Sequence, residues 1–413
     1  MLDDDQVSAT PAEPVIPLYV GTREVSSYAD LEELFKDPKF HPITHGPGRR
    51  SRPFIGETIL SFDGEEHFKT RKAQAQLFSR RTLEHYELDV VAPAIERRLA
   101  AAAAHRDEDG LVRVDLLRLG REMLSAMAAK IIGFEPLDDG NRLDRFMSLM
   151  EYLLGGLSVE FAITDHEQIL QDGFAAKEDF WREFVLPARE AVLSPEGAER
   201  RSARQDLMSV LLNDNPGLDD DSLIRNCILY AAASINTTAT AAVHTVDNLA
   251  RWFAGHPDDW ERRNDRSFLR RAASETLRLH PPAPGMLREA GAEKTTQSGL
   301  HLEQGDICKM HVTRANLETE RFGECPAHFV PERDAKDAKP YGLAFGGGRH
   351  TCIGRPLALP SHASPGEMID GILVKLLRAF YQAGVEPDPE RAPELQASAR
   401  ETFDTYPVVF RRL

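Results

Sequence analysis

The sequence predicts a mainly α-helical chain with small β-sheets, an α+β fold organised as one large domain. Three observations lead to this prediction. Apolar residues recur at helical spacing in one stretch after another between residues 65 and 280. After Pro281 the pattern changes to short alternating segments with turn residues, as in 293–310. Apolar residues make up 42% of the 413 residues, which is enough for a substantial core.

The order of the elements follows from the same patterns. Residues 1–14 are acidic and polar and should form a disordered arm, whereas residues 15–413 should form the single domain. Residues 15–34 predict a short strand-rich segment and a helix, and the many Pro and Gly residues of 41–64 predict a loop. A late helix is expected at about 365–383 and a strand at 406–410. The remaining helices are expected at 65–79, 83–105, 112–133, 140–156, 166–195, 204–213, 220–254 and 265–280.

Composition excludes several classes of protein. The formal net charge of −16 argues against a general nucleic-acid binder, which needs a basic face. The 4 cysteines form no CxxC pair and no zinc-ligand spacing, which favours a reducing compartment over a disulfide scaffold. There is no apolar signal core at the start and no apolar run of the roughly 20 residues that a membrane span requires. We therefore expect a soluble, cytoplasmic, monomeric protein.

The most specific segment is residues 345–354, Phe-Gly-Gly-Gly-Arg-His-Thr-Cys-Ile-Gly, with its cysteine at position 352. A metal-binding thiolate needs a rigid loop that presents the sulfur, and glycines such as Gly346 permit backbone geometries that other residues resist. Gly354 would let a helix begin directly behind the sulfur, where the helix N-terminus favours negative charge. Phe345 would shield the sulfur from water. The alternatives are a glycine-rich turn beside an ordinary buried cysteine, or a phosphate loop, which the absence of a following Lys-Ser/Thr disfavours.

The offsets of Phe, Gly, His, Cys and Gly in this segment resemble the haem-ligand signature of the cytochrome P450 family. The resemblance extends over about residues 15–413. It implies a helix-rich fold with a long central helix over haem b (iron protoporphyrin IX), and it makes Cys352 the expected ligand of the iron.

Two further charged groups match the same family. Glu275 and Arg278 have the i,i+3 spacing at which helical side chains meet. Alone, such a pair is usually solvated, but here Leu-His-Pro-Pro follows at 279–282 and ends the helix, as in the Glu-x-x-Arg segment of the family. The segment 329–333 resembles the one whose arginine, here Arg333, completes a structural triad with this pair.

Cationic side chains suited to the haem propionates are also present. His67 and Arg71 lie at i,i+4 spacing on an expected helix, where the simplest interpretation would be a solvent-facing basic turn. The resemblance instead implies that both bind a propionate, together with Arg288 and His350, since charge-assisted hydrogen bonds suit carboxylates.

The longest expected helix, 220–254, has the small-residue centre Ala-Ala-Ala-Ser-Ile-Asn-Thr-Thr at 231–238. Such residues also suit tight helix packing, but the position and the Thr pair resemble the oxygen-binding segment of the family, Ala-Gly-x-Asp/Glu-Thr-Thr. The resemblance makes Thr237 the hydroxyl that binds dioxygen and places Asn236 where the family has an acid. An amide has no accessible pKa for proton transfer, so the proton route must differ.

A second departure follows the cysteine. Pro360 should break the helix that runs on behind the ligand in the family. The segment Ser-Pro-Gly-Glu at 364–367 has the features of a new helix start. We therefore expect a loop at about 358–364 on the side where redox partners dock in this family.

Taken together, the resemblance implies a haem-thiolate monooxygenase that inserts one oxygen atom from dioxygen into a hydrophobic small molecule. Electrons would come from a separate ferredoxin or flavodoxin with its reductase, because no flavin or nicotinamide domain is fused. Asn236 keeps open a peroxide-driven or nitric-oxide-reducing enzyme, and a non-catalytic haem-thiolate sensor is a further alternative, which Thr237 disfavours. The expected walls of an apolar substrate pocket are Phe54, Ile55, Ile59, Ala232, Ala233, Pro284, Met286 and Phe403.

Overall fold

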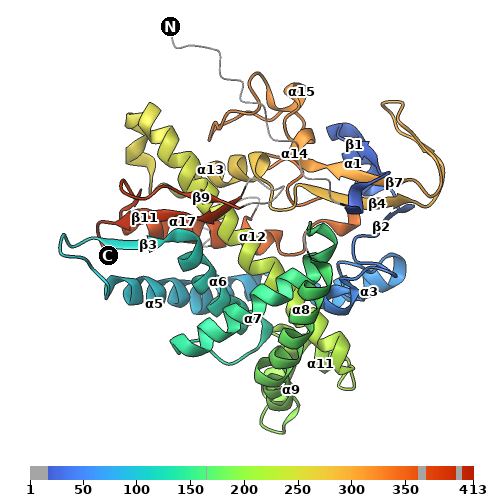
Figure 1. Ribbon diagram of the computed structural model, residues 1–413, viewed down its shortest axis with the longest axis horizontal. Helices are drawn as coiled ribbons and strands as arrows, with labels where there is room; N and C mark the ends of the chain where they lie inside the picture. The colour runs from blue at the N-terminus through green and yellow to red at the C-terminus, as the bar shows by residue number, and fades with distance from the viewer. Residues whose placement is uncertain (1–16, 164, 361–368, 397–401) are drawn as a thin grey trace.

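The computed structural model describes residues 17–163, 165–360, 369–396 and 402–413, so the arm expected at 1–14 lies outside the described residues. Helices dominate the molecule, and the longest, α12 (Asp220–Gly255), crosses its middle (Figure 1). The predicted mainly helical fold with small sheets is confirmed. The other helices are α1 (Tyr28–Lys36), α2 (Arg52–Ile55), α3 (Gly64–Gln74), α4 (Arg80–His85), α5 (Ala92–Ala103), α6 (Leu116–Ile132), α7 (Gly140–Ser158), α8 (His166–Phe180), α9 (Leu186–Leu193), α10 (Ala198–Ala203), α11 (Leu207–Asp214), α13 (Arg266–Leu279), α14 (Val312–Ala315), α15 (Thr319–Phe322), α16 (Arg355–Ala358) and α17 (Ile372–Gln382).

Aspartate residues cap the N-termini of most of the long helices. Before α12, the Asp219 carboxylate accepts a hydrogen bond from the N–H of Ser222, which satisfies one of the donors left free at a helix start. The same arrangement precedes α6, α7, α8, α11 and α13, at Asp115, Asp139, Asp165, Asp206 and Asp265. The helix starts are therefore largely encoded next to each helix in the sequence.

Two of the expected long helices contain a π-helical turn. The turn η3 (Tyr86–Val91) joins α4 to α5, and η5 (Trp181–Val185) joins α8 to α9. Each turn precedes a proline near the start of the next helix, Pro93 or Pro187. Because proline has no N–H to continue the regular ladder, the preceding turn is the place where the hydrogen-bond pattern changes.

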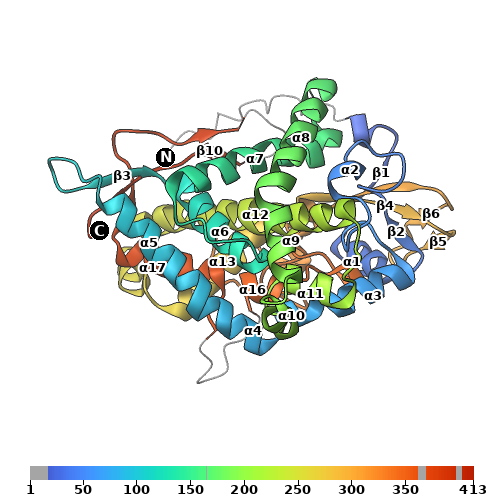
Figure 2. The ribbon, with the colours of Figure 1, turned by 90° about the horizontal axis from the view of Figure 1, so that it is seen from below.

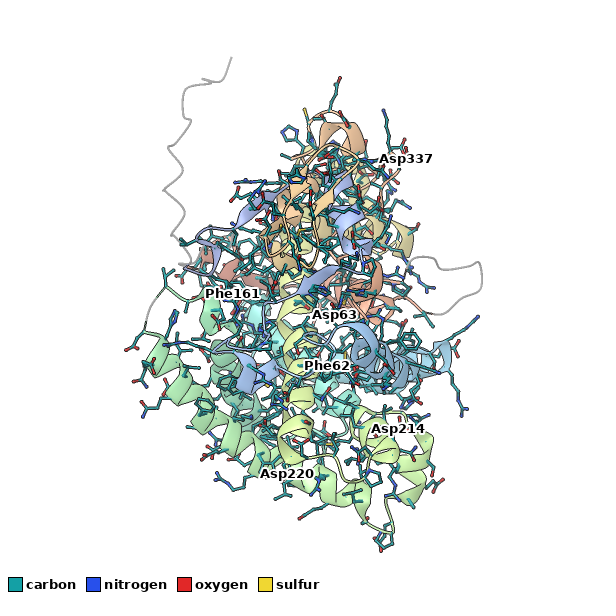
Figure 3. The ribbon with its side chains drawn as sticks, turned by 90° about the vertical axis from the view of Figure 1, so that its right-hand side faces the viewer. Phe62, Asp63, Phe161, Asp214, Asp220 and Asp337 are labelled. Atoms are coloured by element: carbon teal, nitrogen blue, oxygen red, sulfur yellow. The ribbon has the colours of Figure 1, made fainter. Side chains whose placement is uncertain are left out.

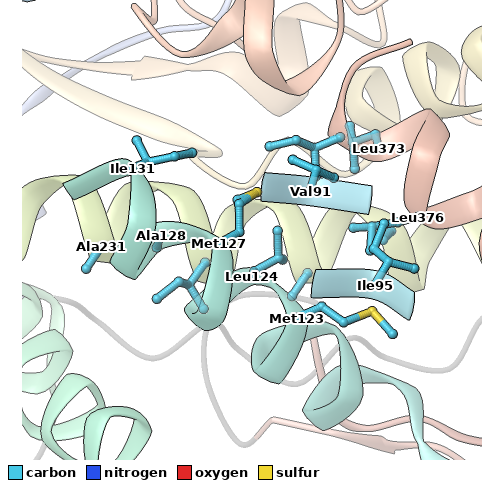
Figure 4. Packing of buried hydrophobic residues seen from close by; sticks show 14 of the residues in the cluster. Val91, Ile95, Met123, Leu124, Met127, Ala128, Ile131, Ala231, Leu373 and Leu376 are labelled. Atoms are coloured by element: carbon cyan, nitrogen blue, oxygen red, sulfur yellow. The ribbon is translucent and has the colours of Figure 1, made fainter. Parts of the chain in front are cut away.

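The main core surrounds α6, which packs along α12. Figure 4 shows α6 side chains such as Leu124 and Met127 meeting Val91 of η3 and Leu373 of α17. Figure 2 shows α12 running lengthwise, with α3 towards one end and α5 and α17 towards the other. Truncation of a buried leucine in such a core costs about 2–5 kcal/mol, so this packing holds α12 firmly in place.

Within the described residues, four small sheets complete the fold. The largest has the order β1-β7-β4-β2, and β4 pairs antiparallel with both of its neighbours. A second has the order β3-β11-β8 and joins the end of the chain to residues near 112. The strands are β1 (Arg23–Val25), β2 (Phe40–Pro42), β3 (Val112–Asp115), β4 (Gly285–Ala290), β5 (Lys294–Thr295), β6 (His301–Leu302), β7 (Ile307–His311), β8 (Val385–Pro387), β9 (Glu394–Leu395), β10 (Phe403–Thr405) and β11 (Pro407–Phe410).

Two predicted helix boundaries are wrong. The helix expected from residue 112 begins only at Leu116, because Val112–Asp115 pairs with Pro407–Phe410 as a strand. The late helix expected from residue 365 begins at Ile372, because Gly371 has φ +80° and is not helical. The predicted new cap at Ser364 lies outside the described residues. The predicted break after the cysteine is present, since α16 ends at Ala358.

The structure also bears on membrane insertion. Of the helices within the described ranges, none combines the length and the hydrophobicity that a bilayer crossing requires.

Candidate active site

The cysteine loop is held rigidly between α1 and α16. The Cys352 N–H donates to the Phe345 carbonyl over 2.9 Å, and the Phe345 ring packs edge-on against Tyr341 at 5.1 Å. Gly348 has φ +59°, and a Cβ there would lie 1.9 Å from the carbonyl oxygen of Phe35. Only glycine satisfies both conditions. Gly354 precedes the first residue of α16, so the helix begins directly behind the cysteine, as its sequence suggested.

The thiol of Cys352 is subject to opposing influences. Burial is the largest and raises its pKa, whereas the N–H groups of Gly354 and Arg355 and the charges of Arg71 and Arg355 lower it. The residue nevertheless has exposed surface. Protein therefore surrounds Cys352 without covering it completely.

The central part of α12 also has exposed surface. Ala233 and Thr237 are exposed although most of the helix around them is buried, and they lie one turn apart on one face. A charge on Cys352 also reaches Tyr230, one turn before Ala233, and contributes to the raised pKa of that phenol. The structure therefore brings the cysteine loop and the small-residue face of α12 together.

The polar residues of this face are arranged in a specific way. The Thr237 hydroxyl donates to the Ala233 carbonyl over 2.6 Å, and the Ser234 hydroxyl donates to the Tyr230 carbonyl over 2.7 Å. Asn236 is half-buried, and within the described part of the chain its amide has no hydrogen-bond partner. The amide is therefore available to a bound molecule or to water.

Basic side chains gather near the cysteine loop. The rings of His67 and His350 lie 4.0 Å apart, and Nε2 of His67 is buried without a hydrogen-bond partner in the described residues. Arg288 is 8% exposed, and burial lowers its pKa to about 10. Neither Arg288 nor Arg71 forms an ion pair with a carboxylate from the described ranges. A buried cation without a direct ion pair, such as Arg288, is costly, so this arrangement fits a ligand that carries carboxylates, such as haem.

Asp63 was not predicted as part of this site. Its carboxylate accepts from the His41 ring, from Arg349 over 2.8 Å and, at 3.4 Å, from His350, and it also caps α3. Figure 3 labels Asp63 near the middle of the molecule. Burial raises the pKa of Asp63, but these contacts outweigh burial, and the pKa is lowered. Asp63 therefore ties the cysteine loop to the helix of His67. Its position just before that helix was the available signal, although it indicated only a cap.

The predicted ionic triad is assembled as one buried unit. Arg278 donates from Nε and Nη2 to the two carboxylate oxygens of Glu275 over 2.8 and 2.7 Å, and Arg333 donates from Nε over 2.8 Å. Arg278 and Arg333 also donate to backbone carbonyls, among them those of Asn316 and Phe322. The triad thereby joins α13 to the segment that leads to the cysteine loop.

Several of the expected pocket residues lie beside α12 or the cysteine loop. Ile55 and Ile59 cluster with Leu229 of α12, next to Ile353, and the Met286 methyl lies 3.5 Å from a Cβ built at Gly346. Ala232 and Ala233 lie on α12 as expected, and the Pro284 carbonyl accepts from Val312.

For Phe54 the prediction is wrong. Its side chain is 0% exposed, because the ring fills a slot between Gly156 of α7 and Gly173 of α8, beside Phe174. Phe403 is 7% exposed and packs against His244 and Tyr406.

The sequence is similar to those of known proteins. The family model described as Cytochrome P450 matches residues 247–380. The chain is 26% identical to a steroid C26-monooxygenase from Mycobacterium tuberculosis (strain CDC 1551 / Oshkosh), over 84% of this chain and 85% of that protein. It is 26% identical to an erythromycin C-12 hydroxylase from Saccharopolyspora erythraea, over 92% and 87% of the two chains.

Solved structures share the fold. The chain superposes on CYP109E1 from Bacillus megaterium in complex with corticosterone with a TM-score of 0.69, at 17% identity, covering 95% of this chain and 93% of that one. For CalO2 the TM-score is 0.71 at 19% identity, covering 95% and 91%.

The fold and the relatives indicate a haem-containing oxidoreductase. The family-model match, the curated relatives and the structural neighbours together indicate a bacterial-type cytochrome P450, a monooxygenase with haem as its cofactor.

Proposed function

We propose that Cys352 provides the axial thiolate of haem b and that the enzyme inserts one oxygen atom from dioxygen into a small hydrophobic substrate. The observation that carries this proposal is the combination of an exposed Cys352, the exposed face of α12 at Ala233 and Thr237, and the buried basic side chains of His67 and Arg288. No other exposed cysteine among the described residues has such surroundings, since Cys325, the other exposed one, lies in the segment before the loop.

Each residue has a distinct role in this proposal. His67, Arg71, Arg288 and His350 hold the two carboxylates of the haem, while Phe345 and the loop glycines keep water from the sulfur. Glu275, Arg278 and Arg333 keep the loop against α13 and do not take part in the reaction. When bound, the haem supplies the activation of dioxygen, and the chain supplies position, protons and a dry site.

Proton delivery is the step in which this chain departs from its family. The Thr237 hydroxyl can hold a proton at Oγ1 and exchange its Ala233 partner for a bound molecule. The Asn236 amide can orient a water molecule by donating to it but cannot release a proton. We therefore propose that protons reach the site through water held by Thr237 and Asn236.

The substrate should be a hydrophobic molecule. The described groups near the cysteine loop and on the middle of α12 are mainly apolar: Ile55, Ile59, Ala232, Ala233, Met286 and, in sequence, Pro284. Two similar proteins are named for a steroid and for erythromycin. We propose a small hydrophobic substrate held mainly by apolar contacts.

The electron donor should be a separate acidic protein, a ferredoxin or a flavodoxin with its reductase. Although the chain carries a net charge of −16, Lys339 and Arg355 flank the ring of Tyr341 beside the cysteine loop. Lys72 on α3 and Arg81 on α4 are exposed. Phe78 lies between those two helices in the sequence, and its ring is 3.9 Å from a Cβ added to Gly354, next to the cysteine. An acidic partner would be steered to such a region. The four free cysteines suit the cytoplasm, and we propose a monomer.

A peroxide-driven or nitric-oxide-reducing enzyme is the second candidate, favoured by Asn236 alone. Incubation with reduced ferredoxin, labelled dioxygen and a substrate that shifts the haem spectrum separates the two. We expect one labelled oxygen atom per product molecule. Product formation only with peroxide would remove the monooxygenase proposal and retain the haem-thiolate one.

The ligand assignment has its own test. Reduced protein with carbon monoxide should give the strongly red-shifted Soret band of a thiolate-ligated haem, and Cys352→His should abolish it. Cys325→Ser, which removes the other exposed cysteine, is the matched control and should keep the band. Persistence of the band in Cys352→His would identify another ligand.

A further inference from the structure

The helix behind Cys352 is interrupted, yet the two ends of the interruption touch. The first part, α16, ends at Ala358, and the second, α17, begins at Ile372. A Cβ added to Gly371 would lie 2.4 Å from Cδ of Pro360 and 2.9 Å from the carbonyl oxygen of Ala358. The chain thus returns to the point that it left, and glycine is required there both by this contact and by its φ of +80°.

Arg270 of α13 joins the two ends. Its guanidinium donates from Nη1 to the Pro360 carbonyl over 2.9 Å and, from Nη2, more weakly to the carbonyls of Ile369 and Asp370 over 3.5 and 3.4 Å. These carbonyls belong to backbone that a continuous helix would have bonded internally. One planar side chain with several donors can serve both ends at once, which a lysine could not do.

Glu87 completes the junction from the opposite side. Its carboxylate accepts from the N–H of Asp370 over 2.7 Å and from the N–H of Gly371 over 3.1 Å, just before α17. Lys375 pairs with it at 3.3 Å, and the Glu87 side chain is 6% exposed. Glu87 lies in the π-helical turn η3, so a cap for α17 comes from a helix that is distant in sequence.

The charge of Asp370 is balanced at the same place. Its carboxylate is 2% exposed and accepts from Nε of Arg266 and, at 3.4 Å, from Nη1 of Arg378. A buried carboxylate is tolerated only with such partners. The junction is therefore a set of complementary charged groups, contributed by η3, α13 and α17.

We propose that Arg270 and Glu87 are positioning residues for the thiolate. By closing the interrupted helix they hold α16 in place, and α16 follows directly on Gly354, where an added Cβ would lie 3.9 Å from the Cys352 sulfur. This inference rests on the proposed role of Cys352 as ligand. It assigns to a charged junction the support that a continuous helix would provide through its own hydrogen bonds.

The test uses two measurements on Arg270→Gln and Glu87→Gln. Both variants carry Cys325→Ser, so that Cys352 is the only exposed cysteine, since Cys227 and Cys308 are buried. The control is Arg271→Gln, the next residue of α13, whose guanidinium pairs with the half-exposed Glu332 instead. Haem-free chain is treated with an alkylating reagent, and haem-loaded chain is reduced under carbon monoxide.

Loss of a charged hydrogen bond at the junction should loosen α16, so that an alkylating reagent reaches the sulfur of Cys352, which protein surrounds, about tenfold faster in the haem-free chain. It should also lower the fraction of thiolate-ligated haem by about half or more, while Arg271→Gln stays at the parent level in both measurements. Alkylation at the parent rate together with an undiminished thiolate band in both variants would overturn the proposal.

Two further outcomes remain interpretable. If Arg270→Gln does not fold, Arg270→Lys retains the charge but cannot span both ends, and it should give an intermediate alkylation rate; a parent rate would count against the proposal. If the parent itself lacks the thiolate band, the role of Cys352 as ligand fails, whereas the alkylation measurement still tests the junction.

Discussion

Glu275 offers the sharpest test of the energetics of this fold. Its carboxylate accepts four hydrogen bonds, two from Arg278, one from Arg333 and one from the N–H of Val330. The side chains of Glu275, Arg278 and Arg333 are 3%, 0% and 9% exposed. Glu275→Ala would leave two buried guanidinium groups without their counter-charge. Removal of one partner from a buried pair costs about 3–5 kcal/mol, a large part of the roughly 5–15 kcal/mol that holds a domain folded.

Urea unfolding of the haem-loaded chain, followed by tryptophan fluorescence, measures this loss, and haem absorbance per chain gives the occupancy. Glu332→Ala is the matched control, since Glu332 pairs with Arg262 and Arg271 but its side chain is 51% exposed. Exposed pairs contribute about 1 kcal/mol or less. We expect Glu275→Ala to be haem-poor and strongly destabilised and Glu332→Ala to resemble wild type. A haem-replete Glu275→Ala with stability within about 1 kcal/mol of the control would refute the reasoning.

Three other changes test separate features. Gly156→Ala places a Cβ 2.7 Å from the ring of Phe54 and should cost about 1–3 kcal/mol in urea unfolding, partly recovered by Phe54→Leu; no loss would mean that the slot is loose. Asn236→Asp should keep donor-driven product formation and change it by about tenfold at most, with an altered solvent isotope effect; complete loss would contradict water-relayed protons. Burial, aided by neighbouring cations, lowers the pKa of His45 to about 4 and the pKa of His244 to about 3. Both side chains therefore stay neutral in the folded protein, whereas the unfolded chain binds protons at these histidines below about pH 6.5. The free energy of unfolding should therefore fall as pH drops from 6.5 towards 4, by up to about 1.4 kcal/mol per pH unit for each histidine, and His244→Phe should remove its share; an unchanged slope would contradict this.

Several predictions succeeded because their causes are local. The starts of α12 and α13 are capped by Asp219 and Asp265, which directly precede them, and α13 ends next to the prolines that follow it. The loop geometry at Gly348 was likewise indicated by the glycine run itself. A helix cap or a glycine turn depends on residues within about one turn of each other, so a single sequence contains the necessary information.

Other features could not be read in this way. The strand Val112–Asp115 exists because Pro407–Phe410 pairs with it from the far end of the chain. An apolar residue such as Phe54 suits a pocket wall and a core position equally well. Only the contact of its ring with Gly156 and Gly173 shows that it belongs to the core. In both cases the partner is chosen by packing rather than by the local pattern.

The sequence by itself determined the helical class, the glycine-rich loop that presents Cys352 and the pairing of Glu275 with Arg278, since each follows from residues close together along the chain. Only the tertiary structure decided that Asp63 joins the cysteine loop to α3 and that Arg270 and Glu87 close the broken helix behind the sulfur. Those contacts join residues separated by 90 or more positions. Such partners become neighbours only after the core around α6 and α12 has packed, because no local spacing relates them.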